Sequence, residues 1–117
     1  MINNRETGTK YENRAAEYLE LNGYQILNKN FRCKIGEIDL IARKEQYLCF
    51  IEVKYRSDTK KGFPAEAITP TKIRRITKTA QFYMLTHHLS PDLPCRFDAV
   101  VILGDRIELI QNAFDAI

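Results

Sequence analysis

Residues 36–54, GEIDLIARKEQYLCFIEVK, decide the fold that this sequence predicts. Branched and aromatic residues dominate both halves of the stretch, and the polar residues Lys44-Glu45-Gln46 separate the halves. This pattern is typical of two β-strands joined by a hairpin. Because side chains two residues apart share a face of a strand, Glu52 and Lys54 follow apolar residues on one face of the second strand. That face changes along its length from apolar to charged.

Asp39 interrupts the apolar run of the first strand, where strand propensity and desolvation both disfavour an acid. If Asp39 and Glu52 face the same side of adjacent strands, they offer two carboxylates to a hard cation such as Mg²⁺ or Mn²⁺, with waters and phosphate as the other ligands. Such an ion neutralises a phosphate oxygen and makes a water nucleophilic near neutral pH. Lys54 is placed to orient that water or to stabilise the developing charge.

These residues fit metal-dependent hydrolysis of a phosphodiester, and the pattern by itself leaves that interpretation open. The competing interpretation is a solvated strand face on which Glu52 and Lys54 form an ordinary ion pair. The apolar neighbours of Asp39 favour the catalytic interpretation, because a solvated face would not include them.

The composition indicates one globular domain, which we expect to span residues 1–117. The chain has 117 residues, of which 44% are apolar and 28% are charged, and these values are ordinary for a soluble protein. The net charge is +3 and the isoelectric point is about 8.8. This balance permits a polyanionic partner such as nucleic acid without requiring one.

The sequence carries no signature of a disulfide framework, a zinc cluster or a membrane span. The three cysteines, Cys33, Cys49 and Cys95, form no C-x-x-C pair, and Cys49 alternates with apolar residues as a core residue does. No uninterrupted apolar segment approaches the length of a membrane span, and the first residues lack signal-peptide character. We therefore expect a reduced, cytoplasmic setting and no membrane partner.

The segment from Gly8 to Asn22 predicts a helix that Thr7 or Thr9 caps and Gly23 ends. At about 100° per residue, Glu12 falls inside the apolar arc of this helix. A carboxylate there either snorkels at the rim or points at the sheet as a third acid beside those of the hairpin. Both interpretations remain open at this point.

The rest of the chain predicts a strand from Tyr24 to Phe31, a helix opened by Thr69-Pro70, and strands at Ala99–Leu103 and Ile107–Ile110. Apolar residues at helical spacing form the buried stripe of the second helix: Ile73, Ile76, Ala80, Tyr83 and Met84. Basic residues lie beside this stripe and in the loop 57–64. They could contact phosphates, which supply most non-specific affinity for nucleic acid, and they also fit an ordinary solvated surface.

The motifs of the chain, taken in order, resemble the YraN-like family of restriction-endonuclease-like, PD-(D/E)XK proteins, which is related to Holliday junction resolvases. They are GxxxExxAAxYL at 8–19, GYxILxxNxR at 23–32, GEIDLIA at 36–42, FIEVKxR at 50–56, KxxRI at 72–76 and RFDAV at 96–100. The resemblance implies an α/β fold with a mixed central sheet flanked by helices, in the order α-β-β-β-α-β-β. The loop 60–64 departs from the usual Phe-Gly order of the family, which leaves substrate contacts there in doubt.

The family site maps onto Glu12, Asp39, Glu52 and Lys54, with Asp39 and Glu52 as the ligands of Mg²⁺ or Mn²⁺. The basic residues expected to bind nucleic acid are Arg32, Arg56, Lys60, Lys61, Lys72, Arg74, Arg75 and Lys78. The implied activity is hydrolysis of DNA, with branched DNA such as Holliday junctions among the suggested substrates. The alternatives are a nucleic-acid-binding or protein-interaction module that retains the fold without cutting, and a structural adaptor. The sequence leaves a homodimer open.

Overall fold

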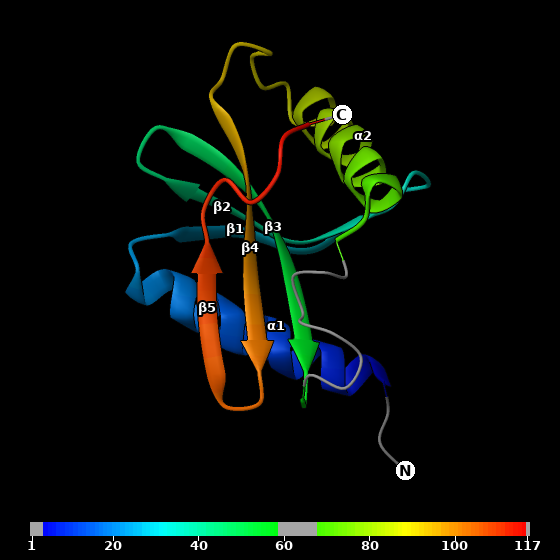
Figure 1. Ribbon diagram of the computed structural model, residues 1–117. Coiled ribbons are helices and arrows are strands. Elements are labelled where there is room, and N and C mark those ends of the chain that lie inside the picture. Colours follow the sequence, from blue (N-terminus) through cyan, green and yellow to red (C-terminus); the bar gives the residue numbers. More distant parts are fainter. Residues whose placement is uncertain (1–3, 59–67, 117) are drawn as a thin grey trace.

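The computed structural model describes residues 4–58 and 68–116 and contains two helices and five strands in this part of the chain (Figure 1). The elements are α1 (Asn4–Leu21), β1 (Gln25–Arg32), β2 (Glu37–Lys44), β3 (Tyr47–Arg56), α2 (Pro70–Thr86), β4 (Cys95–Leu103) and β5 (Arg106–Ile110). Their order is the predicted α-β-β-β-α-β-β, so the α/β class is confirmed. None of the helices within these residues is long and apolar enough to cross a membrane.

The strands form one mixed sheet in the order β1-β2-β3-β4-β5. Neighbouring strands are antiparallel except for β3 and β4, which run parallel from Leu48↔Cys95 to Arg56↔Leu103. Parallel neighbours need a long crossover connection, and the chain between β3 and β4 contains α2. The hairpin predicted from residues 36–54 is present as the β2–β3 pair, with β3 as the central strand.

The two helices cover opposite faces of the sheet, because alternate residues of β3 pack against different helices. Cys49 and Ile51 belong to the core that includes Ala15, Ala16 and Leu19 of α1. The α2-side core contains Leu48, Phe50, Ile76, Ala80 and Tyr83. In Figure 1, α1 and α2 accordingly lie on either side of the strands. The predicted core position of Cys49 is confirmed, since this residue is 0% exposed.

Local sequence signals explain the start of α2 and the end of α1 better than the start of α1. Thr69 caps α2 by accepting a hydrogen bond from the Lys72 backbone N–H at 3.3 Å, and Pro70 occupies the first turn, as predicted. At the end of α1, Gly23 adopts a φ of +87°, which suits glycine in a helix-ending turn. The start of α1 is a correction: the helix begins at Asn4, so neither Thr7 nor Thr9 is its N-cap.

The alternation of β2 breaks at Asp39. Regular alternation would place Ile38 and Leu40 on the same face of the sheet. Instead, Ile38 packs in the α2-side core together with Ile41, whereas Leu40 packs in the α1-side core. The strand is therefore irregular at the acid that its sequence singles out, and this irregularity positions the candidate site.

Candidate active site

The candidate site lies where β2 separates from β3. The ladder between these strands ends at Leu40↔Ile51, whereas β3 continues along β4 as far as Arg56. The edge of β3 beyond Ile51 thus loses its β2 partner. Asp39 replaces part of that ladder, because its Oδ2 accepts a hydrogen bond from the Val53 backbone N–H at 2.8 Å. A partly buried backbone donor is thereby satisfied by a carboxylate instead of a carbonyl.

A pocket of about 340 Å³ opens at this separation, between the first half of α1 and the start of α2. It contains all four residues that the sequence predicts for the catalytic site, Glu12, Asp39, Glu52 and Lys54, and is completed by Gly8, Tyr11, Glu37, Val53, Tyr55 and Lys72. Glu12 therefore borders the same space as the two strand carboxylates.

Glu52 is held by two lysines that bind the same oxygen. Lys54 Nζ lies 3.1 Å and Lys72 Nζ 2.8 Å from Glu52 Oε1. The side chains of Glu52 and Lys54 are only 6% and 16% exposed. The ion pair of the competing interpretation is thus present, but it lies inside a pocket instead of on a solvated strand face.

Among the described residues, Asp39 forms no ion pair like those of Glu52, although the charge of Lys72 acts on it. Burial, followed by the nearby charges of Glu52, Glu12 and Glu37, raises the pKa of Asp39 from its ordinary value of 3.8 to about 8, against the lowering effect of the Val53 N–H. Burial likewise raises the pKa of Glu12, although hydrogen bonds to Asn30 and Asp39 oppose that shift. The pocket therefore concentrates negative charge that its own lysines only partly neutralise.

The lysines respond to the pocket in opposite directions. Burial and the neighbouring Lys72 lower the pKa of Lys54. Burial acts to lower the pKa of Lys72 too, but the hydrogen bond and charge of Glu52 outweigh it, so the pKa of Lys72 is raised. Lys72 consequently holds its proton more strongly than Lys54 does.

Comparison with known proteins places the chain in a family. Residues 11–102 match the family described as "Uncharacterised protein family UPF0102". The chain belongs to the UPF0102 family. It is 55% identical over 115 residues to the UPF0102 protein of Lachnoclostridium phytofermentans, which covers 98% of each chain. It is 45% identical to that of Syntrophus aciditrophicus, over 98% of this chain and 93% of the relative, and 44% identical to that of Clostridioides difficile, over 97% and 100%. The YraN-like resemblance is confirmed at this level.

Asn30 is a site residue of this UPF0102 protein that sequence reasoning did not assign. From β1 its side chain acts to lower the pKa of Glu12, and its φ of +54° lies in the left-handed region. Asparagine tolerates that region better than most residues. Asn30 follows a register shift between Ile26 and Asn28. Its signal in the sequence is weak: a residue poorly suited to strands stands inside a predicted strand.

The residues predicted to bind nucleic acid are divided between the pocket and the surface. Lys72 lies in the pocket on Glu52, whereas the sequence placed it beside the apolar stripe of α2. Arg32 forms an exposed ion pair with Glu37 at 2.8 Å. Arg74, Arg75 and Lys78 lie exposed on α2. Lys60 and Lys61 fall outside the described residues.

Arg56 has an unusual environment near the end of β3. Its Nη1 donates to the Tyr55 carbonyl at 2.9 Å, but its Nε is buried and has no hydrogen-bond partner among the described residues. A buried donor without an acceptor is costly. Arg56 shares its strand face with Glu52 and Lys54, so this free donor lies on the same side of the sheet as the two carboxylate-bound lysines.

The carboxylates fit a divalent ion with an open coordination shell. Within residues 4–58 and 68–116, no group of three or more His, Cys, Asp or Glu side chains is arranged to hold a metal ion. Mg²⁺, however, is commonly held by only one or two carboxylates, together with waters and substrate phosphates. Asp39 and Glu52 supply that number from neighbouring strands, and the excess negative charge around Asp39 favours a cation.

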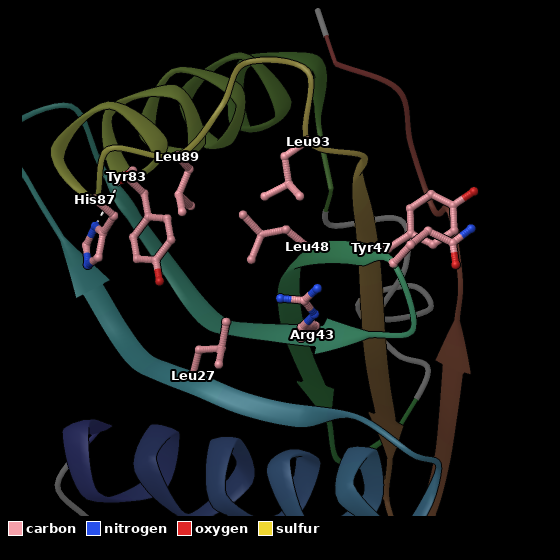
Figure 2. A pocket seen from close by; sticks show the side chains of 9 residues that line it. Leu27, Arg43, Tyr47, Leu48, Tyr83, His87, Leu89 and Leu93 are labelled. Atoms are coloured by element: carbon pink, nitrogen blue, oxygen red, sulfur yellow. Dashed lines mark hydrogen bonds between the residues drawn. The ribbon is translucent and has the colours of Figure 1, made fainter.

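A second pocket lies on the α2 side of the sheet, at the opposite end of β3 (Figure 2). It measures about 200 Å³, and its lining is mostly apolar: Leu27, Leu48, Leu89, Leu93, Tyr47 and Tyr83, with Arg43, Gln46 and His87. Tyr83 donates to Asn28 Oδ1 at 2.7 Å, and His87 Nδ1 contacts the Tyr83 carbonyl at 2.9 Å. Since no carboxylate lines this pocket, it lacks the groups that the predicted hydrolysis needs.

Asp98, the acid of the RFDAV motif, is fully satisfied and therefore structural. Its oxygens accept hydrogen bonds from Tyr24 at 2.7 Å, from Arg96 at 2.8 and 3.0 Å, and from the Asn112 backbone at 2.8 Å. Burial, together with the hydrogen bond to Asp98 and its charge, raises the pKa of Tyr24 to about 12, against the lowering effect of Gln111. This network joins the end of α1 to β4 and the C-terminal segment. Asp39 differs in that it forms no ion pair within the described part of the chain.

Proposed function

We propose that this UPF0102 protein is a metal-dependent endonuclease of the PD-(D/E)XK type that hydrolyses DNA phosphodiester bonds. The observation that carries the proposal is the convergence of Asp39, Glu52 and Lys54 in one pocket, in which Asp39 is buried beside other carboxylates and forms no ion pair with any described residue. An acid whose pKa is raised by burial and by nearby charges, and which lines a pocket, is a candidate functional residue.

Each pocket residue has a role that its surroundings support. Asp39 and Glu52 would hold Mg²⁺ or Mn²⁺, which when bound activates water and neutralises a phosphate oxygen. Lys54 lies 3.1 Å from Glu52 Oε1, and its lowered pKa suits a group that orients the attacking water and exchanges a proton with it. Lys72 supplies a fixed positive charge for the phosphate. Glu12, held by Asn30, is placed to position the waters around Asp39.

The basic surface supports DNA as the substrate. Arg74, Arg75 and Lys78 are exposed on α2, whose first turn delivers Lys72 to the pocket. Arg56 is half-buried and lies on the same face of β3 as Glu52 and Lys54. Branched DNA as the preferred form and the cytoplasm as the location are part of the same proposal, and both rest on the family resemblance.

The second candidate function is a nucleic-acid-binding module that retains the fold and does not cut. It is favoured by the two lysines on Glu52 Oε1, because they already neutralise a carboxylate that a metal ion would need. The two candidates differ in what happens at Glu52 when a divalent ion is offered.

A cleavage assay separates them. Wild-type protein is incubated with single-stranded, duplex, flap and four-way DNA in Mg²⁺ or Mn²⁺, beside Glu52→Gln and Lys54→Ala. The nuclease should cut at least one substrate. Glu52→Gln should lose both metal binding and cleavage, and Lys54→Ala should keep metal binding while cleavage falls. Glu17→Gln, an exposed change on α1 outside the pocket, is the matched control. Cleavage by Glu52→Gln at the wild-type rate would assign the activity to a different site or to a contaminant.

A further inference from the structure

Two tyrosines stack on each other at the side of the carboxylate pocket. Tyr11 of α1 and Tyr55 of β3 have ring centroids 3.6 Å apart and an interplanar angle of 15°. Both rings are half-buried, and both line the pocket that contains Asp39 and Glu52. Lys10 Nζ lies 5.9 Å from the centroid of the Tyr11 ring.

The pair is close to the proposed reaction centre. Tyr55 follows Glu52 by three residues, which is about 10 Å along a strand. It points to the α1 side, where it packs at the margin of the α1-side core. One side of the pair packs against the apolar core. The other side borders an open, charged pocket, and core packing gives no reason for aromatic rings there.

We propose that the Tyr11–Tyr55 pair is a stacking platform for an unpaired nucleobase, so that the site takes DNA with a single-stranded segment beside the phosphate to be hydrolysed. This inference rests on the proposed function and specifies its substrate class.

The chemistry of nucleic acids supports an unpaired base over a paired one. In duplex DNA each base is paired and stacked on its neighbours, and exposing one costs a few kcal/mol. Single-strand-binding surfaces combine aromatic side chains, which stack on any base, with cations that track the backbone. The pocket provides both, since Lys54 and Lys72 border it together with the tyrosines and Lys10 flanks them. Such stacking is tolerant of sequence, so the platform selects DNA structure and not a base sequence.

Fluorescence of 2-aminopurine tests the platform without any cleavage. The protein is titrated in EDTA into a flap substrate that carries 2-aminopurine in its unpaired segment beside the junction, and into the blunt duplex of matched length. The wild type should quench the fluorescence and bind the flap more tightly than the duplex. Tyr55→Ala and Tyr11→Ala should each weaken flap binding by about tenfold or more and leave duplex affinity unchanged. Tyr55→Phe and Tyr55→Trp should retain flap binding because the stacking face persists.

Tyr18→Ala is the matched control, because Tyr18 lies two turns beyond Tyr11 on the same helix and outside the pocket. Circular dichroism verifies each fold, and the second tyrosine keeps the test valid if one variant does not fold. The inference is overturned if the alanine variants weaken flap and duplex binding equally, or if the wild type leaves 2-aminopurine fluorescence unchanged. If the wild type binds the flap more tightly than the duplex but cuts no DNA in Mg²⁺, the proposed nuclease function is refuted and the stacking platform stands. If the wild type cuts DNA but binds flap and duplex equally, the stacking platform is refuted and the nuclease function stands. A protein that binds no DNA refutes both proposals.

Discussion

Replacing Asp39 by asparagine should stabilise the metal-free protein at alkaline pH. Asparagine keeps an oxygen for the Val53 N–H, which Asp39 Oδ2 accepts at 2.8 Å, but it removes a charge that Glu52 and Glu12 repel. The folded-state pKa of Asp39 is raised to about 8. The folded protein therefore retains a proton that the unfolded chain releases, and stability falls as pH rises from about 4 to about 8.

The size of this effect follows from the pKa. A difference between the ordinary value of 3.8 and about 8 corresponds to an upper limit of about 5–6 kcal/mol, at 1.36 kcal/mol per pH unit. The coupled carboxylates share the proton, and asparagine forms a weaker hydrogen bond than a carboxylate, so we expect about 2 kcal/mol at pH 8.5. For a chain of this size this is a rise in Tm of about 5–10 °C.

Urea unfolding in EDTA, followed by circular dichroism from pH 5 to pH 8.5, measures the difference between Asp39→Asn and the wild type. The difference should grow with pH across this range. Asp92→Asn, an exposed change, is the control and should show no such trend. An asparagine variant that is less stable at pH 8.5, or a difference that is constant with pH, would refute the interpretation that burial and the neighbouring carboxylates destabilise ionised Asp39.

Three further outcomes follow from the contacts. Lys72→Met removes one of the two cations on Glu52 Oε1, so Mg²⁺ affinity by calorimetry should rise, and a weaker affinity would show that Lys72 supports the site instead of competing in it. Thr69→Ala removes the cap of α2 and should lower the free energy of unfolding by about 1 kcal/mol in urea, whereas no change would deny the cap a role. The variant with Arg74, Arg75 and Lys78 all changed to glutamine should reduce the slope of log Kd against log salt for DNA by about 3, and an unchanged slope would remove this face of α2 from the interface.

Local patterns in the sequence were sufficient to predict the hairpin, the α2 cap and the element order. The β2–β3 pair follows from two apolar runs around a polar break, and Thr69-Pro70 carries its own capping chemistry. Asp39 stood out because an acid in an apolar strand demands a partner. Its predicted neighbour Glu52 does lie beside it, since the hairpin register brings their strands together.

Features that depend on tertiary contacts could not be predicted in the same way. The break in alternation at Asp39 places Ile38 in the α2-side core and Leu40 in the α1-side core. No local sequence pattern predicts this break. The sequence does not distinguish Lys72 from the other basic residues of the second helix. Its ion pair with Glu52 depends on where α2 packs against the sheet. The contact of Tyr11 with Tyr55 joins residues that are far apart in the sequence, one in α1 and one in β3. The local pattern around each tyrosine predicts only an ordinary core aromatic residue.

A calorimetric titration of Mg²⁺, repeated with Mn²⁺, into the wild type, Glu52→Gln and Glu17→Gln at pH 8 tests the central claim most directly. The claim is that the pocket of Asp39 and Glu52 holds a divalent ion. The wild type and Glu17→Gln should bind one ion per chain, and Glu52→Gln should bind none. Absence of binding to the wild type, or equal binding to Glu52→Gln, would contradict the account and leave a DNA-binding module as the remaining function.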